Sequence, residues 1–301
     1  MSLPTSLAPR RILFSVLLLA AGLVAGAADV KNSVTGKNIH AISFMSESLG
    51  EERSVSILLP PDYDTATRRY PTLYLLHGYG DDNTAWSYMT NLSGYGAHHE
   101  MIIVMPDGSK SFYVNSASDP KARFEDFITK DLVAYVDSHY RTIPQPRARA
   151  IAGLSMGGYG AAELGLKHAH EFSALGSFSG AVGVAHEAPA APDPKASAQA
   201  RRDRQATDDL LGPVGSPARA DHDPFVWLDK VAPADLPFIY VACGGEDFLV
   251  EQNRAFVRAM AARKIPYEYR EISPRVHAWD FWDDQIRIFL NLLDQRPGWG
   301  A

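Results

Sequence analysis

The feature that most constrains this chain is a Gly-x-Ser-x-Gly segment, Gly153 to Gly157, between an apolar run and a helix-forming run. This order of strand, tight turn and helix is typical of a nucleophile elbow, in which the serine occupies a strained turn. The two glycines are expected to be small because strand and helix pass close together there. Ser155 is then a candidate nucleophile at a helix N-terminus. A glycine-rich turn with a chemically inactive serine is the alternative interpretation of this segment taken alone.

The composition is that of an ordinary globular protein. Of the 301 residues, 46% are hydrophobic and 21% are charged, which suits one large α/β domain with a sizeable core. The net charge of -6, together with the absence of a basic cluster, argues against a nucleic-acid partner. The single cysteine excludes internal disulfide bonds and a thiolate metal site.

The first 27 residues have the pattern of a secretory signal peptide. A pair of arginines precedes an apolar run over residues 12–24, and an Ala-Gly-Ala cleavage pattern ends at Ala27. The run is too short for a comfortable transmembrane span. We therefore expect removal of residues 1–27, one catalytic domain over residues 28–301, and a periplasmic or secreted protein without stable membrane insertion. A retained N-terminal anchor is the alternative.

Short apolar runs bounded by turn residues predict a sheet whose central strands are buried on both faces. One of these runs leads directly into His77-Gly78-Tyr79, the kind of turn from which an α/β hydrolase forms part of its oxyanion hole. We expect the backbone N–H groups of Tyr79 and Met156 to be the two donors. His77 is interpreted as a packed residue that shapes this loop. The predicted strands cover residues 39–46, 54–59, 72–76, 101–105, 148–152, 174–179, 237–242 and 267–272.

Two later strand ends carry the remaining candidates for a catalytic triad. Asp247 follows the strand predicted over residues 237–242, and Glu246 beside it is the alternative acid. Asp247 is favoured because it lies further into the turn. The loop after the last predicted strand contains His277, just before a predicted helix. The chain order Ser, Asp, His is the order of α/β hydrolases and differs from the orders in chymotrypsin and subtilisin.

Other acidic and histidine residues are assigned no chemistry. Glu125 and Asp126 near the start of a helix predicted over residues 124–140 are expected to interact favourably with the helix dipole. His168 and His170 are two positions apart on a helix, so their side chains do not face each other as a metal-binding pair would. We therefore predict no metal site.

Four side chains near the strand ends are candidates for contact with a substrate. Tyr113 and Asn115 lie in an aromatic loop at the edge of the sheet, where loops commonly line pockets. Trp86 and Trp279 could contribute to an aromatic pocket that suits a phenolic acyl group. Packing in the core is the alternative for each aromatic residue.

The segment over residues 181–224 differs from the rest of the chain in composition. It is rich in Ala, Pro, Asp and Arg, and shows almost no apolar periodicity. We expect an irregular excursion over the active-site edge, a candidate lid, and not a second domain.

The chain resembles the α/β-hydrolase esterase family that contains esterase D, the secreted mycolyltransferases of the antigen 85 type, bacterial feruloyl and acetylxylan esterases, and tributyrin esterases. The resemblance extends over about residues 38–293. It implies an α/β-hydrolase fold with a mostly parallel central sheet and helices on both faces. It also implies an acid at Asp247 and an oxyanion donor directly after Gly78. The matching stretches are Leu75–Asp82, Val104–Gly108, Ser111–Ser116, Gly153–Gly158, Gly245–Leu249 and His277–Trp279.

These observations predict an exported serine carboxylesterase acting through Ser155, His277 and Asp247. The expected substrates are short-chain esters or acetyl and feruloyl groups linked to polysaccharides, and no metal or organic cofactor is required. An acyltransferase of the mycolyltransferase type, in which an alcohol replaces water, is the alternative. A binding module without catalysis is a third reading, and the complete set of triad residues counts against it.

Overall fold

The structure, a computed structural model, describes residues 38–186 and 197–300. The predicted signal peptide over residues 1–27 lies outside these ranges and stays a prediction. Part of the predicted excursion, residues 187–196, also lies outside them. Within the two described ranges, no helix combines the length and the apolar character needed to cross a lipid bilayer.

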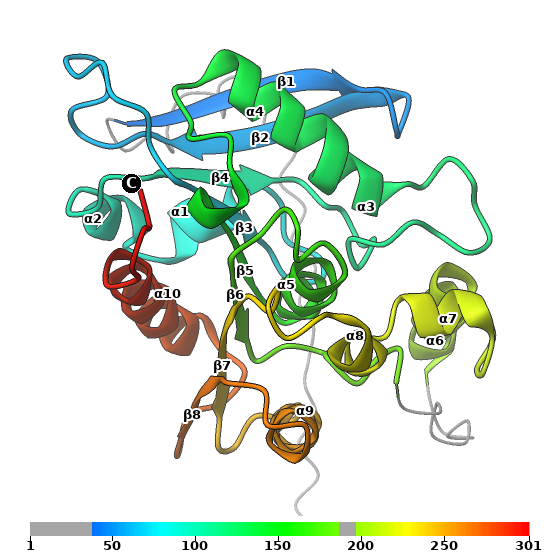
Figure 1. Ribbon diagram of the computed structural model, residues 1–301. Coiled ribbons are helices and arrows are strands. Elements are labelled where there is room, and N and C mark those ends of the chain that lie inside the picture. Colours follow the sequence, from blue (N-terminus) through cyan, green and yellow to red (C-terminus); the bar gives the residue numbers. More distant parts are fainter. Residues whose placement is uncertain (1–37, 187–196, 301) are drawn as a thin grey trace, which may run out of the picture. The chain divides into compact units, whose positions relative to one another are not determined.

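An eight-stranded sheet forms the centre of the fold, in the order β1-β2-β4-β3-β5-β6-β7-β8 (Figure 1). The β1/β2 and β2/β4 pairs are antiparallel, and all later pairs are parallel. The predicted strands are present, with ends that differ by a few residues. Their bounds are β1 Ile39–Ser46, β2 Glu51–Leu58, β3 Thr72–Leu76, β4 Ile102–Pro106, β5 Arg149–Leu154, β6 Ala174–Phe178, β7 Phe238–Gly244 and β8 Glu268–Ile272.

The central strands carry apolar side chains on both faces of the sheet, as their short apolar runs predict. Successive residues of a strand point to opposite faces. In β4, Ile102 and Val104 therefore belong to one buried cluster, whereas Ile103 and Met105 belong to the other. The sheet separates two hydrophobic cores, and each core needs a layer of helices to exclude water.

Helices cover both faces (Figure 1). On one face α1 (Ala85–Met89), α2 (Leu92–Gly96) and α10 (Trp279–Asp294) contribute Trp86, Leu92 and Phe289 to one core. On the other face the second core includes side chains from α4 (Val133–His139), α5 (Met156–Lys167), α8 (Pro224–Lys230) and α9 (Val250–Ala262). This arrangement confirms the predicted α/β-hydrolase fold.

The helix predicted over residues 124–140 is present but is not uniformly α-helical. It consists of α3 (Phe124–Asp126), a π-helical segment (Phe127–Leu132) and α4. The buried residues Phe127 and Leu132 lie five positions apart, which is the separation of a π-helical hydrogen bond and not an α-helical spacing.

The segment over residues 181–224 is more regular than we expected. It contains α6 (Ala198–Leu211) and α7 (Pro217–Asp221). In α6 the Gln199 and Gln205 side chains donate hydrogen bonds to Asp203 and Asp209, one turn further on, both at 2.8 Å. Such polar pairs support a helix without an apolar face, so apolar periodicity in the sequence does not reveal this helix.

Candidate active site

Ser155 lies in the sharp turn between β5 and α5, with φ 52° and ψ -114°. A positive φ is costly for a residue with a side chain and is typical of a strained functional turn. A methyl group added at Gly153 would lie 2.5 Å from the backbone of Gly157, and one added at Gly157 would lie 2.5 Å from the Leu76 carbonyl oxygen. Both positions therefore require glycine, as the elbow spacing predicts.

Three side chains from separate strand ends form one line of hydrogen bonds. His277, in the loop between β8 and α10, has its Nε2 3.0 Å from the Ser155 hydroxyl oxygen. Its Nδ1 lies 2.9 Å from Oδ2 and 3.1 Å from Oδ1 of Asp247, in the turn after β7. The structure thus brings together Ser155, His277 and Asp247, which are far apart in the sequence.

The carboxylate of Asp247 is fully buried, whereas the alternative acid Glu246 is exposed. Burial by itself would raise the pKa of Asp247. The hydrogen bonds from His277 and from the backbone N–H of Leu249, at 2.8 Å, outweigh burial and hold its pKa below the ordinary value. Asp247 therefore faces His277 as a carboxylate near neutral pH.

The turn after β3 lies directly beside Ser155. A methyl group added at Gly78 would lie 3.8 Å from Cβ of Ser155. Met156 is the first residue of α5, and N–H groups in the first turn of a helix have no partner within the helix. Among the described residues, no backbone carbonyl accepts a hydrogen bond from the N–H of Tyr79 or Met156. Both amides are free to donate to a ligand beside Ser155.

His77 holds this turn in place, as the sequence interpretation suggests. Its Nε2 accepts a hydrogen bond from the N–H of Gly108 at 2.9 Å, so its other ring nitrogen, Nδ1, carries the proton. Nδ1 then donates to the carbonyl oxygen of Gly78 at 2.8 Å. His77 is almost completely buried, which excludes it from direct contact with a substrate.

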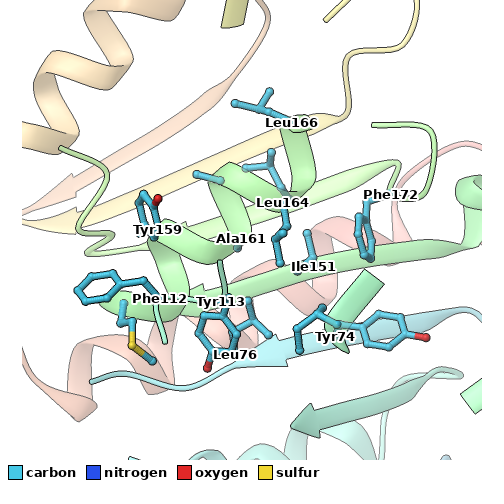
Figure 2. Close-up of a cluster of buried hydrophobic side chains, with 14 of the residues drawn as sticks. Tyr74, Leu76, Phe112, Tyr113, Ile151, Tyr159, Ala161, Leu164, Leu166 and Phe172 are labelled. Atoms are coloured by element: carbon cyan, nitrogen blue, oxygen red, sulfur yellow. The ribbon is translucent and has the colours of Figure 1, made fainter. Parts of the chain in front are cut away.

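Two of the four candidate substrate contacts, Tyr113 and Trp86, are packed inside the protein. Tyr113 is fully buried among the side chains between α5 and the sheet (Figure 2). Trp86 is 1% exposed, and its indole N–H donates to the Leu76 carbonyl at 3.0 Å. The side-chain oxygen of Asn115 accepts from the backbone N–H of Asp126 at 3.2 Å. For Tyr113 and Trp86 the structure shows the core packing that was the alternative interpretation, because loop position does not reveal which way a side chain points. Asn115 is partly exposed and stays a candidate.

Aromatic rings surround the imidazole of His277. Trp282 packs edge-to-face on it with a centroid distance of 4.8 Å, and Trp279 packs in the same way on Trp282 at 5.3 Å. Phe248 lies 4.5 Å from the imidazole on another side and is 77% exposed. No role was predicted for Phe248 from the sequence, although an aromatic residue directly after the acid in a turn is a signal for one. Phe248 is exposed and Trp279 is partly buried, and Tyr79, in the turn beside Ser155, is also exposed.

The sheet order, the strained serine turn and the Ser-His-Asp line together define an α/β hydrolase. The sequence model of the family described as "Putative esterase" matches residues 46–289. The chain therefore belongs to this esterase family and is a serine hydrolase that acts on carboxylic ester bonds.

Relatives with known names agree with this membership. An acetyl esterase from Caldicellulosiruptor saccharolyticus is 31% identical over 82% of this chain and 95% of its own length. An endo-1,4-beta-xylanase/feruloyl esterase from Xylanibacter ruminicola is 31% identical over 55% of this chain and 24% of its length. Among solved structures, the fluorophosphonate-binding serine hydrolase FphF from Staphylococcus aureus has a TM-score of 0.71 at 25% identity, covering 84% of this chain and 97% of FphF.

Proposed function

We propose that this chain hydrolyses esters through Ser155 as nucleophile, His277 as general base and Asp247 as the residue that orients the imidazole. The observation that carries the proposal is the unbroken line of contacts from the Ser155 hydroxyl through both ring nitrogens of His277 to Asp247. Because Asp247 accepts from Nδ1, the tautomer with a free lone pair on Nε2 is favoured, and this lone pair faces the serine.

The first half of the reaction forms an acyl-enzyme. As the Ser155 oxygen attacks the ester carbonyl, its proton passes to Nε2 of His277, and the imidazolium is stabilised by the buried Asp247. The backbone N–H groups of Tyr79 and Met156 are placed to donate to the oxygen on which negative charge develops. One such donor is typically worth about 100- to 1,000-fold in rate. The alcohol then leaves with the proton from His277.

The second half releases the acid. Water takes the position of the alcohol, gives a proton to His277 and attacks the acyl group, so the same residues act in reverse roles. No step requires a metal ion or an organic cofactor. An acceptor alcohol in place of water would make the same acyl-enzyme the intermediate of an acyltransferase.

The proposed substrates are short acyl esters and acetyl or feruloyl groups linked to polysaccharides. The acetyl esterase relative supports a short acyl group, and the feruloyl esterase relative supports an aromatic one. The exposed ring of Phe248 beside His277 offers an apolar contact to either the acyl group or the alcohol. With the signal-like sequence at residues 1–27, we propose that the enzyme acts outside the cytoplasm.

The test is hydrolysis of p-nitrophenyl esters from acetate to decanoate, and of methyl ferulate, by residues 28–301. The matched variants are Ser155→Ala and Ser118→Ala, since Ser118 is an exposed serine outside the site. We expect Ser155→Ala to lower kcat by about 1,000-fold or more and Ser118→Ala to leave it unchanged. Activity retained by Ser155→Ala would refute the proposed nucleophile.

The same assay separates hydrolysis from acyl transfer. A rate that is independent of added alcohol supports a hydrolase. An acyl-enzyme that accumulates and is discharged faster by an added alcohol supports the acyltransferase. Failure to turn over any ester would refute the proposed function.

A further inference from the structure

A second buried cluster of titratable side chains lies where α5 meets the segment that joins α7 to α8. It contains Glu125 of α3, Glu163 of α5 and His222, and all three are buried. One oxygen of each glutamate and one ring nitrogen of His222 lie within 4.8 Å of one another. At 1.5 Å per residue, Glu163 lies about 12 Å along the helix from Ser155. The cluster is therefore separate from the proposed catalytic residues.

Two members of the cluster lack a hydrogen-bond partner within the described part of the chain. Neither carboxylate oxygen of Glu163 has one, although this side chain is fully buried. Nδ1 of His222 also has none, since its distance of 3.6 Å from the Glu163 carboxylate exceeds a hydrogen bond. Buried polar groups in native proteins are nearly always paired, and an unpaired carboxylate is especially costly. The two groups face each other at 3.6 Å, and Lys167 lies 3.7 Å from the same Glu163 oxygen.

The charges around the cluster do not balance. Lys167 contacts three carboxylates: Glu125 at 2.9 Å, Glu163 at 3.7 Å and Asp221 at 2.5 Å. With neutral imidazoles, three negative charges face one positive charge. A divalent cation would compensate the excess of negative charge.

We propose that Glu125, Glu163 and His222 bind a divalent cation, with Zn²⁺ as the ion that best fits the ligands. Zn²⁺ takes imidazole nitrogen and carboxylate oxygen at about 2.0–2.2 Å in a tetrahedral arrangement, so neighbouring ligand atoms lie about 3.4 Å apart. The observed 3.6 Å between Glu163 and His222 is close to that spacing. Mg²⁺ and Ca²⁺ prefer six or more oxygen ligands, which three side chains with one nitrogen do not supply.

Two of the ligands are already held in place by neighbouring groups. Nε2 of His168 contacts Glu125 at 2.8 Å, which restrains one ligand carboxylate. The Tyr159 hydroxyl donates to the backbone carbonyl of His222 at 2.5 Å and so ties the second ligand to α5. Lys167 keeps Asp221 as its partner when the two glutamates turn toward the ion. The site would join three segments around the helix that carries Ser155, so the ion would stabilise the fold without taking part in ester cleavage.

The experiment measures Zn²⁺ bound to the full mature chain after removal of metal with a chelator. Metal content after equilibrium dialysis against ZnCl₂ and the thermal unfolding temperature are followed for wild type, Glu163→Gln and His222→Gln. His170→Gln, which changes an exposed histidine nearby, is the control. Loss of an outer-shell partner lowers metal affinity roughly 10- to 100-fold, so loss of a direct ligand is expected to cost at least about tenfold.

Wild type and His170→Gln are expected to bind one Zn²⁺ per chain and to unfold at a higher temperature with Zn²⁺ than without it. Glu163→Gln and His222→Gln are expected to fold without Zn²⁺ and to lose this increase. No bound Zn²⁺ in wild type, or equal binding by all variants through surface histidines, would overturn the proposal.

Lys167→Met gives an independent answer if the ligand variants fail to fold. Removing the ammonium that competes with the ion should raise Zn²⁺ affinity and enlarge the Zn²⁺-induced rise in unfolding temperature. If Lys167 is instead the only cation of an ordinary ion-pair cluster, Lys167→Met will be destabilised and Zn²⁺ will not restore it. That result would also overturn the proposal.

Discussion

The hydroxyl of Tyr113 donates a hydrogen bond to the carbonyl oxygen of His77, at 3.0 Å, from a side chain that is fully buried. This bond attaches the loop after β4 to the turn that carries Tyr79. His77 is bonded in turn to the N–H of Gly108 on the same loop. The position of the Tyr79 N–H, the proposed oxyanion donor, therefore depends on the hydrogen bonds of His77, two residues earlier in the chain. These bonds lie where a substrate does not reach.

Removal of this hydroxyl tests the role of the buried loop. Tyr113→Phe is expected to lower the free energy of unfolding by about 1–3 kcal/mol, because a buried carbonyl loses its donor. The matched control is Tyr74→Phe, since the Tyr74 hydroxyl is also buried but has no hydrogen-bond partner among the described residues. That change should be neutral or stabilising in urea denaturation. Equal destabilisation by both variants would contradict the assigned role of Tyr113.

The identity of the acid is tested by a second matched pair, Asp247→Asn and Glu246→Gln. Asparagine cannot supply the buried negative charge that stabilises the imidazolium, so Asp247→Asn should lower kcat by about 1,000-fold or more. Glu246 is exposed, and Glu246→Gln should change kcat less than about twofold. Steady-state kinetics with p-nitrophenyl acetate provides the measurement. A larger loss in Glu246→Gln would reverse the assignment.

The acid limb of the activity profile should report His277 and not Asp247. A general base must be neutral, so kcat/KM should fall at acid pH, because an imidazole that has gained a proton can no longer accept one. Asp247 has a lowered pKa and therefore stays ionised further into the acid range than an ordinary aspartate. Measurements of kcat/KM from pH 4 to 9 provide the check. A profile that stays flat down to pH 4 would contradict a histidine base.

The same lowered pKa predicts the effect of acid on stability. Asp247 binds a proton less readily in the folded protein than in the unfolded chain, whose ordinary value is 3.8. Its contribution to the free energy of unfolding is therefore fully present above that value and is lost as the pH falls through the folded pKa. Asp247→Asn should lack this loss when unfolding is measured between pH 5 and pH 2. If Asp247→Asn shows the same pH dependence of the free energy of unfolding as wild type, a group other than Asp247 causes the loss of stability in acid.

Phe248 is expected to select substrates. If its exposed ring packs against the bound ester, Phe248→Ala should lower kcat/KM for methyl ferulate by about tenfold, equivalent to about 1.4 kcal/mol of lost apolar contact. The effect on p-nitrophenyl acetate should be smaller because a methyl group offers little contact area. Tyr88→Ala on α1 is the control, since Tyr88 is similarly exposed. Equal losses for both esters would indicate that Phe248 acts only through the position of His277.

Much of the scaffold could be predicted because it depends on local sequence properties. Apolar runs such as Leu73 to Leu76 identify strands buried on both faces, and glycine spacing identifies the elbow. Element ends were less accurate, and α6 was missed because its polar side-chain pairs leave no apolar stripe. The burial of Tyr113 and Trp86 could not be predicted for a related reason. The sequence around each ring is the same whether the ring faces the core or the solvent, so the sequence does not distinguish the two positions.

Sequence alone determined the fold class, the esterase family and the order of Ser155, Asp247 and His277, since each follows from residue types at the ends of recognisable strands. The sequence already favoured Asp247 over Glu246, and the tertiary structure adds the burial of its carboxylate and the 2.9 Å distance to the imidazole, which exist only after folding. The cluster of Glu125, Glu163 and His222 was invisible for the same reason. Its members come from three separate segments, and only tertiary packing brings one ligand atom of each within 4.8 Å of the others.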